Sequence, residues 1–486
     1  MKSIKETQVR RNVLMNMLLT MSSFIFPLIT FPYVSRILGP EGTGKVSLAT
    51  SFISYFSLFA QLGIPTYGVR CCARARDNRE ELSRVAHELL SVNLVMNLAV
   101  YLVLGLTICC VPRIREEKSL YIILSFTIIL QSVGMEWLYK GLEQYTYITV
   151  RSLIFKLIAL AGMFLLVHQA DDYVIYGGIT IFAASASNIL NLVNARKYIS
   201  LHPVGGCHPL RHLKPVLIFF ALACAATIYT HLDTVMLGFM TTNTDVGYYD
   251  ASVKIKRIAI GLVTSVGTVL LPRASYYIER GLTEEFRKIG AKALEFIFVA
   301  APPLVVYFIL YAGQAIDLLS GPAYAGAVLP MRIIMPTVLF IGLTNILGIQ
   351  ILVPLGKEKT VLRSTIAGAV TDLILNAILI PRYASAGAAA GTLAAEFVVL
   401  CWQYAALRDQ VRPIFLKARY LSICLSLLAA AGVSLLLSRL ELNSFGILAV
   451  TGISFFPVYF FLLVLMKEPL CAEAIRQVTG RIRHRN

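Results

Sequence analysis

Apolar segments of about twenty residues recur about fourteen times along this chain, with short loops between them. A helix of about 20 residues is long enough to cross a hydrocarbon core of roughly 30 Å. The composition agrees, because 57% hydrophobic and 15% charged residues would leave too much apolar surface on a soluble protein of 486 residues. The sequence therefore predicts an all-α polytopic membrane protein of about 14 transmembrane helices. We expect spans at residues 12–35, 46–69, 85–110, 119–139, 150–168, 174–195, 215–238, 247–271, 291–312, 329–353, 361–380, 386–407, 420–438 and 446–466.

The basic residues are distributed unevenly between alternate loops. About 32 of the 44 Lys and Arg fall in the N-terminus, the even-numbered loops and the C-terminus, and about seven fall in the odd-numbered loops. The positive-inside rule then predicts a multi-pass membrane protein with both termini in the cytoplasm. A formal charge of +17 dispersed in this way also argues against a nucleic-acid partner, which would require a basic patch.

Cysteine and histidine patterns indicate no metal site and no cofactor. The nine cysteines are scattered without any CxxC pair, so a disulfide framework is not expected. One loop brings together His202, Cys207, His208 and His212, but this spacing matches no standard zinc pattern.

Short segments recur at an offset of about 200 to 215 residues. LGPEGTGKVSLA (38–49) is echoed by LGFMTTNTDVGYYDAS (237–252), and GLEQYTYITVRS (141–152) is echoed by GKEKTVLRS (356–364). The offset spans six predicted helices, so both copies have the same orientation and are related by a pseudo-twofold axis along the membrane normal. Coincidence in a Leu-, Gly- and Ala-rich sequence is the alternative.

The repeat predicts three parts of the chain. Residues 1–200 form a six-helix N-terminal lobe and residues 201–412 form a six-helix C-terminal lobe. Residues 413–486 add two helices and a basic cytoplasmic tail.

Polar side chains recur every three or four residues on the repeat-equivalent helices of the two lobes. Such spacing places them on one helix face, and we expect the stripes to line a central cavity. Hydrogen bonding between neighbouring helices is the alternative role of such stripes. The stripes include Asn16 and Ser23 in the first span, Ser54 and Gln61 in the second, Thr227 and His231 in the seventh, and Asp250, Lys254 and Arg257 in the eighth.

Charged residues at membrane depth are costly, from about 2.5 kcal/mol upward, and therefore mark partners or ligands. Lys254 and Arg257 lie inside their span, and Asp250 is four residues before Lys254, a spacing that allows an ion pair. A local pair near the interface is the alternative. Asp233 ranks beside these residues, and below them come Glu136, Lys156, Arg332, Asp372 and Glu396.

Several motifs together resemble one family of membrane proteins. They are LGPEGTG (38–44), LGIPTYGVR (62–70), EWLYKGLEQYTYITVRS (136–152), LDTVMLGF (232–239), VGYYDASVKI (246–255), ILVPLGKEK (351–359) and LIPRYASAGAAAGTLAAE (379–396). In combination they resemble the Wzx-type polysaccharide repeat-unit flippases of the multidrug/oligosaccharidyl-lipid/polysaccharide exporter superfamily. The resemblance runs through nearly the whole chain.

The resemblance implies a fold and a substrate. The fold is a V-shaped, MATE- and MurJ-like arrangement of two six-helix lobes plus two C-terminal helices. The substrate is a polyprenyl-diphosphate-linked oligosaccharide, flipped by alternating access for capsule, O-antigen or exopolysaccharide synthesis, with polymerase and glycosyltransferases as candidate partners. On this reading Lys254 and Arg257 attract the diphosphate, and Asn16, Ser23, Ser54 and Gln61 contact sugar. Candidate ion-coupling or pairing residues are Asp233, Asp250 and Glu396.

Three alternatives remain open. A multidrug/cation antiporter shares the fold but typically keeps carboxylates in the N-terminal cavity, where this chain offers neutral polar groups. A lipid II flippase is disfavoured because no charged residue lies between Asn12 and Ser35. A membrane enzyme such as a polysaccharide polymerase should show long outer loops with a catalytic set, and the longest outer loop, 313–328, has Asp317 as its one carboxylate. We therefore predict a transporter and not an enzyme.

Overall fold

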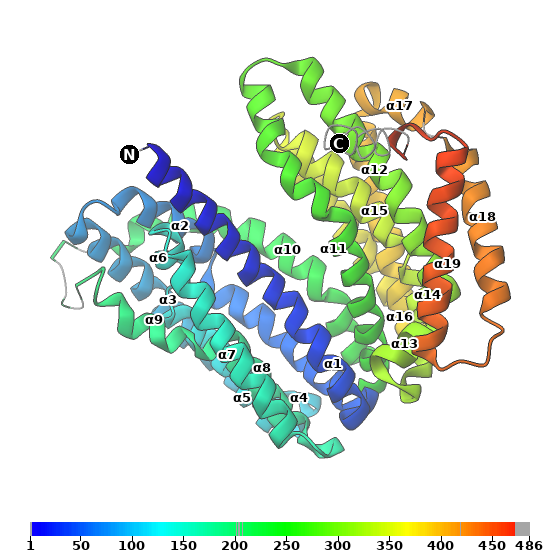
Figure 1. Cartoon of the computed structure of the whole chain (residues 1–486). Coiled ribbons are helices and arrows are strands. Elements are labelled where there is room, and N and C mark those ends of the chain that lie inside the picture. Colours follow the sequence, from blue (N-terminus) through cyan, green and yellow to red (C-terminus); the bar gives the residue numbers. More distant parts are fainter. Residues whose placement is uncertain (1, 201, 203–204, 207, 418, 472–486) are drawn as a thin grey trace. The chain divides into compact units, whose positions relative to one another are not determined.

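The computed structural model describes residues 2–200, 202, 205–206, 208–417 and 419–471. These residues are almost entirely helical and include no strand (Figure 1). The chain divides into two compact units, Met1–Gly247 and Tyr248–Asn486. The predicted all-helical architecture is therefore confirmed, whereas the lobe borders at 200 and 412 stay a prediction.

The first unit is built around one long helix. α1 runs over Lys2–Gln61 and contains a single break at Gly39, whose φ of 64° lies in the left-handed region that favours glycine. Pro40 follows directly, so the chain bends where the predicted spans 12–35 and 46–69 are separated. The other elements are α2 (Ile64–Ala75), α3 (Arg79–Cys110), α4 (Pro112–Glu116), α5 (Lys118–Val133), α6 (Glu136–Gly141), α7 (Tyr145–Leu166), η1 (Ala170–Asp172), α8 (Tyr173–Ile181), η2 (Phe182–Ala186), α9 (Asn188–Ala195), η3 (Pro209–His212) and α10 (Leu213–Met240).

The second unit has a similar long, broken helix. α16 covers Glu358–Ala406 and breaks at Ala384, where φ is 47°, in the predicted gap between spans 361–380 and 386–407. The next helix after α10, α11 (Asn243–Glu279), leads from the first unit into the second. The other elements are α12 (Thr283–Leu310), α13 (Ala312–Ser320), η4 (Pro322–Ala327), α14 (Val328–Ile334), α15 (Thr337–Thr344), η5 (Asn345–Leu352), α17 (Arg408–Lys417), α18 (Tyr420–Leu437) and α19 (Ser444–Leu465).

The described residues form ten helices that are long and apolar enough to cross a membrane, or eleven if the bent pair Pro322–Ile334 and Thr337–Leu352 counts as one span. The predicted number of fourteen is not confirmed. Two of the ten, α1 and α16, each cover two predicted spans, which are separated by the kinks at Gly39 and Ala384. The protein is a multi-pass membrane protein.

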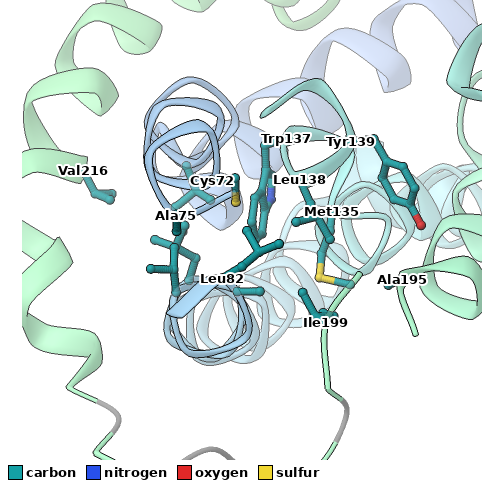
Figure 2. Packing of buried hydrophobic residues seen from close by; sticks show 14 of the residues in the cluster. Cys72, Ala75, Leu82, Met135, Trp137, Leu138, Tyr139, Ala195, Ile199 and Val216 are labelled. Atoms are coloured by element: carbon teal, nitrogen blue, oxygen red, sulfur yellow. The ribbon is translucent and has the colours of Figure 1, made fainter. Parts of the chain in front are cut away.

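One core cluster fixes α2, α3 and α6 of the first unit together (Figure 2). The indole of Trp137 in α6 packs against Gly68 in α2, where a Cβ would lie 2.9 Å from the ring. Tyr139 is fully buried and donates a hydrogen bond of 2.5 Å to the carbonyl of Asn191 in α9. Val216 of α10 belongs to the same cluster. Close packing of this kind holds helices together where lipid removes the hydrophobic driving force.

Candidate functional site

The first unit contains a polar pocket of about 320 Å³. Its walls are formed by the second half of α1, the start of α2, α5 and α10. Of these helices, α1 packs against both α5 and α10. Its lining residues are Thr50, Ile53, Ser54, Ser57, Leu58, Gln61, Gly63, Pro65, Thr66, Leu124, Thr127, Gln131, Ala223, Thr227 and His231.

Two glutamines from different helices meet at the pocket wall. Gln61 Nε2 donates to Gln131 Oε1 at 2.6 Å and to Ser57 Oγ at 2.8 Å, and Ser57 Oγ donates to Gln131 Oε1 at 3.0 Å. These bonds orient both amides. They leave Oε1 of Gln61 and Nε2 of Gln131 as an acceptor and a donor that a ligand in the pocket could use.

The α10 wall carries the single titratable side chain among the described lining residues, His231. Its Nδ1 lies 3.2 Å from Ser51 Oγ on α1, and its ring packs edge-on near Tyr55, with ring centroids 6.4 Å apart. The remaining polar lining groups are hydroxyls and amides. The pocket is therefore suited to neutral, hydroxyl-rich ligands and carries no carboxylate among the residues described.

Four neutral residues were predicted to bind substrate, and two of them line the pocket. Ser54 and Gln61 do so from the second half of α1. Asn16 and Ser23 lie before the break at Gly39, are exposed, and are not among the lining residues. The break at Gly39 separates them from Ser54 and Gln61, although the sequence placed all four residues around one cavity. Contact of Asn16 and Ser23 with substrate stays a prediction.

The predicted cations lie on α11 in the second unit. Lys254 forms an ion pair with Asp250, as the spacing of four residues indicated, and both side chains are half-buried. Arg257 follows about one turn later and is exposed. Of the other carboxylates, Asp233 in α10 and Glu396 in α16 are buried.

Sequence reasoning missed Gln131. It lies four residues after Thr127 on α5, and this spacing was the available signal. Lys156 in α7, which the sequence ranked below Lys254 and Arg257, donates from Nζ to Ser22 Oγ at 2.8 Å and to Ser23 Oγ at 3.0 Å on α1.

The His-rich loop has a structural partner. His212 Nε2 lies 2.8 Å from Glu88 Oε2, and Arg211 Nη2 lies 2.6 Å from the same oxygen. Cys207 lies outside the described residues, and the described His, Cys, Asp and Glu side chains form no cluster that could hold a metal ion. The His212 side chain is therefore a partner of Glu88, and His208 contributes its backbone N–H to the same carboxylate.

The helices, the broken long spans and the polar pocket define a polytopic membrane protein with a polar site inside its helical bundle. A model of the family described as "Polysaccharide biosynthesis protein" matches residues 9–278, more than half of the chain. The chain belongs to this family.

Curated relatives agree with this assignment. The chain is 26% identical over 400 residues, 80% of its length and 94% of the relative, to the "Putative O-antigen transporter" of Escherichia coli (strain K12). It is 28% identical over 167 residues, 34% of its length and 35% of the relative, to the "Probable flippase AglR" of Haloferax volcanii.

Solved structures show the same fold. The inward closed conformation of the lipid II flippase MurJ matches with a TM-score of 0.74 at 16% identity, covering 94% of this chain and 99% of that one. An inward-facing multidrug resistance MATE family transporter of the MOP superfamily matches with a TM-score of 0.63 at 13% identity, covering 81% and 95%. The MATE- and MurJ-like fold predicted from the sequence is confirmed.

Proposed function

We propose that this protein is a flippase that moves lipid-linked oligosaccharide repeat units across the cytoplasmic membrane for surface polysaccharide synthesis. The family, the O-antigen transporter relatives and the flippase fold support the proposal. The observation that carries it is the neutral polar pocket within a bundle of apolar helices. Alternating access moves the substrate without covalent chemistry, so no enzymatic step is required.

The pocket chemistry matches a sugar. Ser54 and Thr227 offer hydroxyls, and Gln61 and Gln131 offer an amide acceptor and donor after their mutual hydrogen bonds are counted. Sugar hydroxyls both donate and accept, so each of these groups can bind one. A polyprenyl chain needs no protein pocket because it can stay in the bilayer.

A polyprenyl diphosphate needs cations, and three candidates are Lys156, Lys254 and Arg257. Arg257 is exposed on α11, and Lys254 beside it shares its charge with Asp250. Lys156 donates to the hydroxyls of Ser22 and Ser23 on the first half of α1, about two turns after Asn16. We propose that Lys254 and Arg257 attract the diphosphate and that Asn16 and Ser23, with Lys156, extend the polar path.

Asp233, Asp250 and Glu396 are the proposed ion-coupling or pairing residues. A carboxylate at membrane depth either pairs or takes up a cation, so each is a candidate for coupling to protons or Na⁺. We further propose that both termini are cytoplasmic and that polysaccharide polymerase and glycosyltransferases are partners.

The multidrug/cation antiporter is the second candidate because it shares the fold. An antiporter that exchanges cations needs a carboxylate in its binding pocket, and the described lining residues offer His231 instead. A lipid II flippase remains the third candidate on fold alone.

Complementation of a strain that lacks its own repeat-unit flippase tests the proposal. Wild type should restore surface polysaccharide and clear accumulated lipid-linked units. At equal membrane abundance, Gln61→Ala/Gln131→Ala should restore less polysaccharide and clear the units more slowly. Gln410→Ala, an exposed glutamine on α17, is the matched control and should behave as wild type. Failure of wild type in a strain that supplies the matching glycan, together with drug resistance on expression, would favour the antiporter.

A further inference from the structure

Glu88 on α3 is a fully buried carboxylate, 0% exposed, and one short segment supplies its donors. The backbone N–H of His208 donates to Oε1 at 2.7 Å. Arg211 donates to Oε2 through Nε at 3.0 Å and Nη2 at 2.6 Å, and His212 Nε2 lies 2.8 Å from the same oxygen. A buried charge persists when it is paired and hydrogen-bonded in this way.

A third helix completes the cluster. His212 Nδ1 lies 2.9 Å from the hydroxyl of Tyr67 on α2, so the imidazole bridges Tyr67 and Glu88. The guanidinium of Arg211 supplies a positive charge that faces Glu88, and the Arg211 side chain is 49% exposed. The cluster therefore joins α2, α3 and η3 within the first unit.

The position of this cluster matters because α10 begins at the next residue, Leu213. The contacts of Glu88 with Arg211 and His212 hold the two residues directly before α10. They therefore fix the position and direction of its first turn. Fourteen and eighteen residues after that start, α10 presents Thr227 and His231 to the pocket.

Along its length, α10 is held by few buried side chains. Among its described residues, the buried ones are Val216, Asp233, Leu237 and Gly238. Val216 packs into the core cluster of Figure 2, and Gly238 lies against Leu48 of α1. Aromatic contacts with α1 and α2 add to these, including Phe220 with Phe59 and Phe219 with Tyr67. Polar contacts at the two ends of α10 supplement this packing.

The far end of α10 is also joined to the first unit by polar contacts. Arg113 of α4 donates to the carbonyl of Thr241 at 2.9 Å and to Asn243 Oδ1 at 3.3 Å. α10 is therefore fastened at its start by Glu88 and at its end by Arg113.

The internal repeat makes this attachment notable. By the predicted offset, α10 is the counterpart of the first half of α1 and begins the second repeat, yet it packs against α1 and α2 in the first unit. Alternating access moves one repeat against the other, so contacts between helices of different repeats change during the cycle. A helix that changes partners needs an attachment that can be broken.

We propose that Glu88 is a positioning residue whose latch on Arg211 and His212 holds α10 against α1 and α2, and so sets Thr227 and His231 at the pocket. The proposal rests on the proposed function only in treating that pocket as the substrate site. Glu88→Gln keeps the size of the side chain but removes the charge that Arg211 pairs with. Since Arg211 can turn to water, we expect α10 to loosen without global unfolding.

Hydrogen exchange of the purified full chain, read by mass spectrometry, tests the latch without substrate. In Glu88→Gln we expect faster exchange at 213–220 and also at 241–247, which lie at opposite ends of a helix of 28 residues, about 42 Å long. We expect a rise of at least fivefold at both ends, partial recovery in Glu88→Asp, and an unchanged pattern in α18 and α19.

The matched control is Glu80→Gln on the same helix, because Glu80 is exposed and pairs with Arg84 across one turn. It should exchange as wild type. A rise confined to 208–215 would mean a local structural bond and would overturn the proposal, as would wild-type exchange at 241–247. If Glu88→Gln does not accumulate, Arg211→Gln replaces it, because that side chain is half exposed, and the same two outcomes apply.

Transport measured on the same variants separates the two proposals. The transport rate of Glu88→Gln should be at least tenfold lower than that of wild type. Its substrate concentration for half-maximal rate should be higher, since Thr227 and His231 are displaced. If wild type transports no lipid-linked oligosaccharide, the proposed function fails, while the exchange data still decide the latch. Normal transport and normal substrate dependence in Glu88→Gln would overturn the latch alone.

Discussion

Asp250 and Lys254 form an ion pair across one turn of α11, and their side chains are 18% and 23% exposed. The pair offsets a charge that is otherwise expensive at membrane depth. Arg257, about one turn further on, is exposed. The two cations that the sequence grouped together therefore have different surroundings.

This pairing predicts a non-additive double mutant. Lys254→Gln or Asp250→Asn alone leaves one charge without its partner and should destabilise the protein by on the order of 1–3 kcal/mol. Asp250→Asn/Lys254→Gln removes both charges and should be more stable than either single variant. Thermal unfolding in detergent measures this, and additive single effects would show that the pair contributes nothing.

Because Gln61 and Gln131 are hydrogen-bonded to each other, we expect the loss of either side chain to reduce transport by a similar factor. Each alanine variant removes one ligand group and also releases the amide of its neighbour, so either alone should slow transport by about tenfold, equivalent to about 1.4 kcal/mol. The double variant should be little worse than either single one. Initial rates at equal membrane abundance test this, and independent multiplicative losses would contradict a joint site.

Glycine at Gly44 and Gly247 allows two backbone segments to touch. A Cβ at Gly44 would overlap the carbonyl oxygen of Asn243, and a Cβ at Gly247 would overlap that of Pro40. Alanine at either position should force the segments apart and cost about 1–3 kcal/mol. Gly313→Ala, where a Cβ meets open space, is the control. Equal unfolding temperatures for all three variants would show that this contact is not tight in the membrane.

Variants of Lys156 and of its partners can separate the effect of its charge on transport from the effect of its hydrogen bonds. Lys156→Arg keeps a cation and should retain most transport, whereas Lys156→Met should lose it by at least tenfold if the ammonium meets an anionic substrate. Ser22→Ala/Ser23→Ala removes the hydrogen-bond partners but keeps the cation and should transport well. A serine double variant as impaired as Lys156→Met would assign Lys156 to joining α1 and α7 instead.

The fold could be predicted from the sequence where the signal is local. Apolar length and Gly39–Pro40 located the first spans and the bend between them. The number of spans was harder to predict from the sequence. The backbone at Ala384 is kinked, and such a kink depends on packing rather than on residue type. The attachment of α10 to the first unit depends on Glu88 and Arg113, whose partners lie more than 120 residues away.

The site was predicted in part for the same reason. Helical spacing identified Ser54 and Gln61, and the spacing of four residues identified the Asp250 and Lys254 pair. Gln131 escaped notice because Thr127 and Gln131 form only a short polar pair on α5, without the longer polar stripe that marked α1. Its role becomes visible when α5 packs against α1 and brings the two amides within 2.6 Å.

The most direct test of the central claim is flipping by the purified protein in liposomes that carry a fluorescent polyprenyl-diphosphate oligosaccharide in the bilayer. A glycosidase outside the vesicles measures the fraction of substrate exposed over time. We predict that wild type raises this fraction from about half toward completion and that Gln61→Ala/Gln131→Ala does so about tenfold more slowly. Wild-type vesicles that retain half of the substrate inside, with an applied proton or Na⁺ gradient of either direction, would contradict the account.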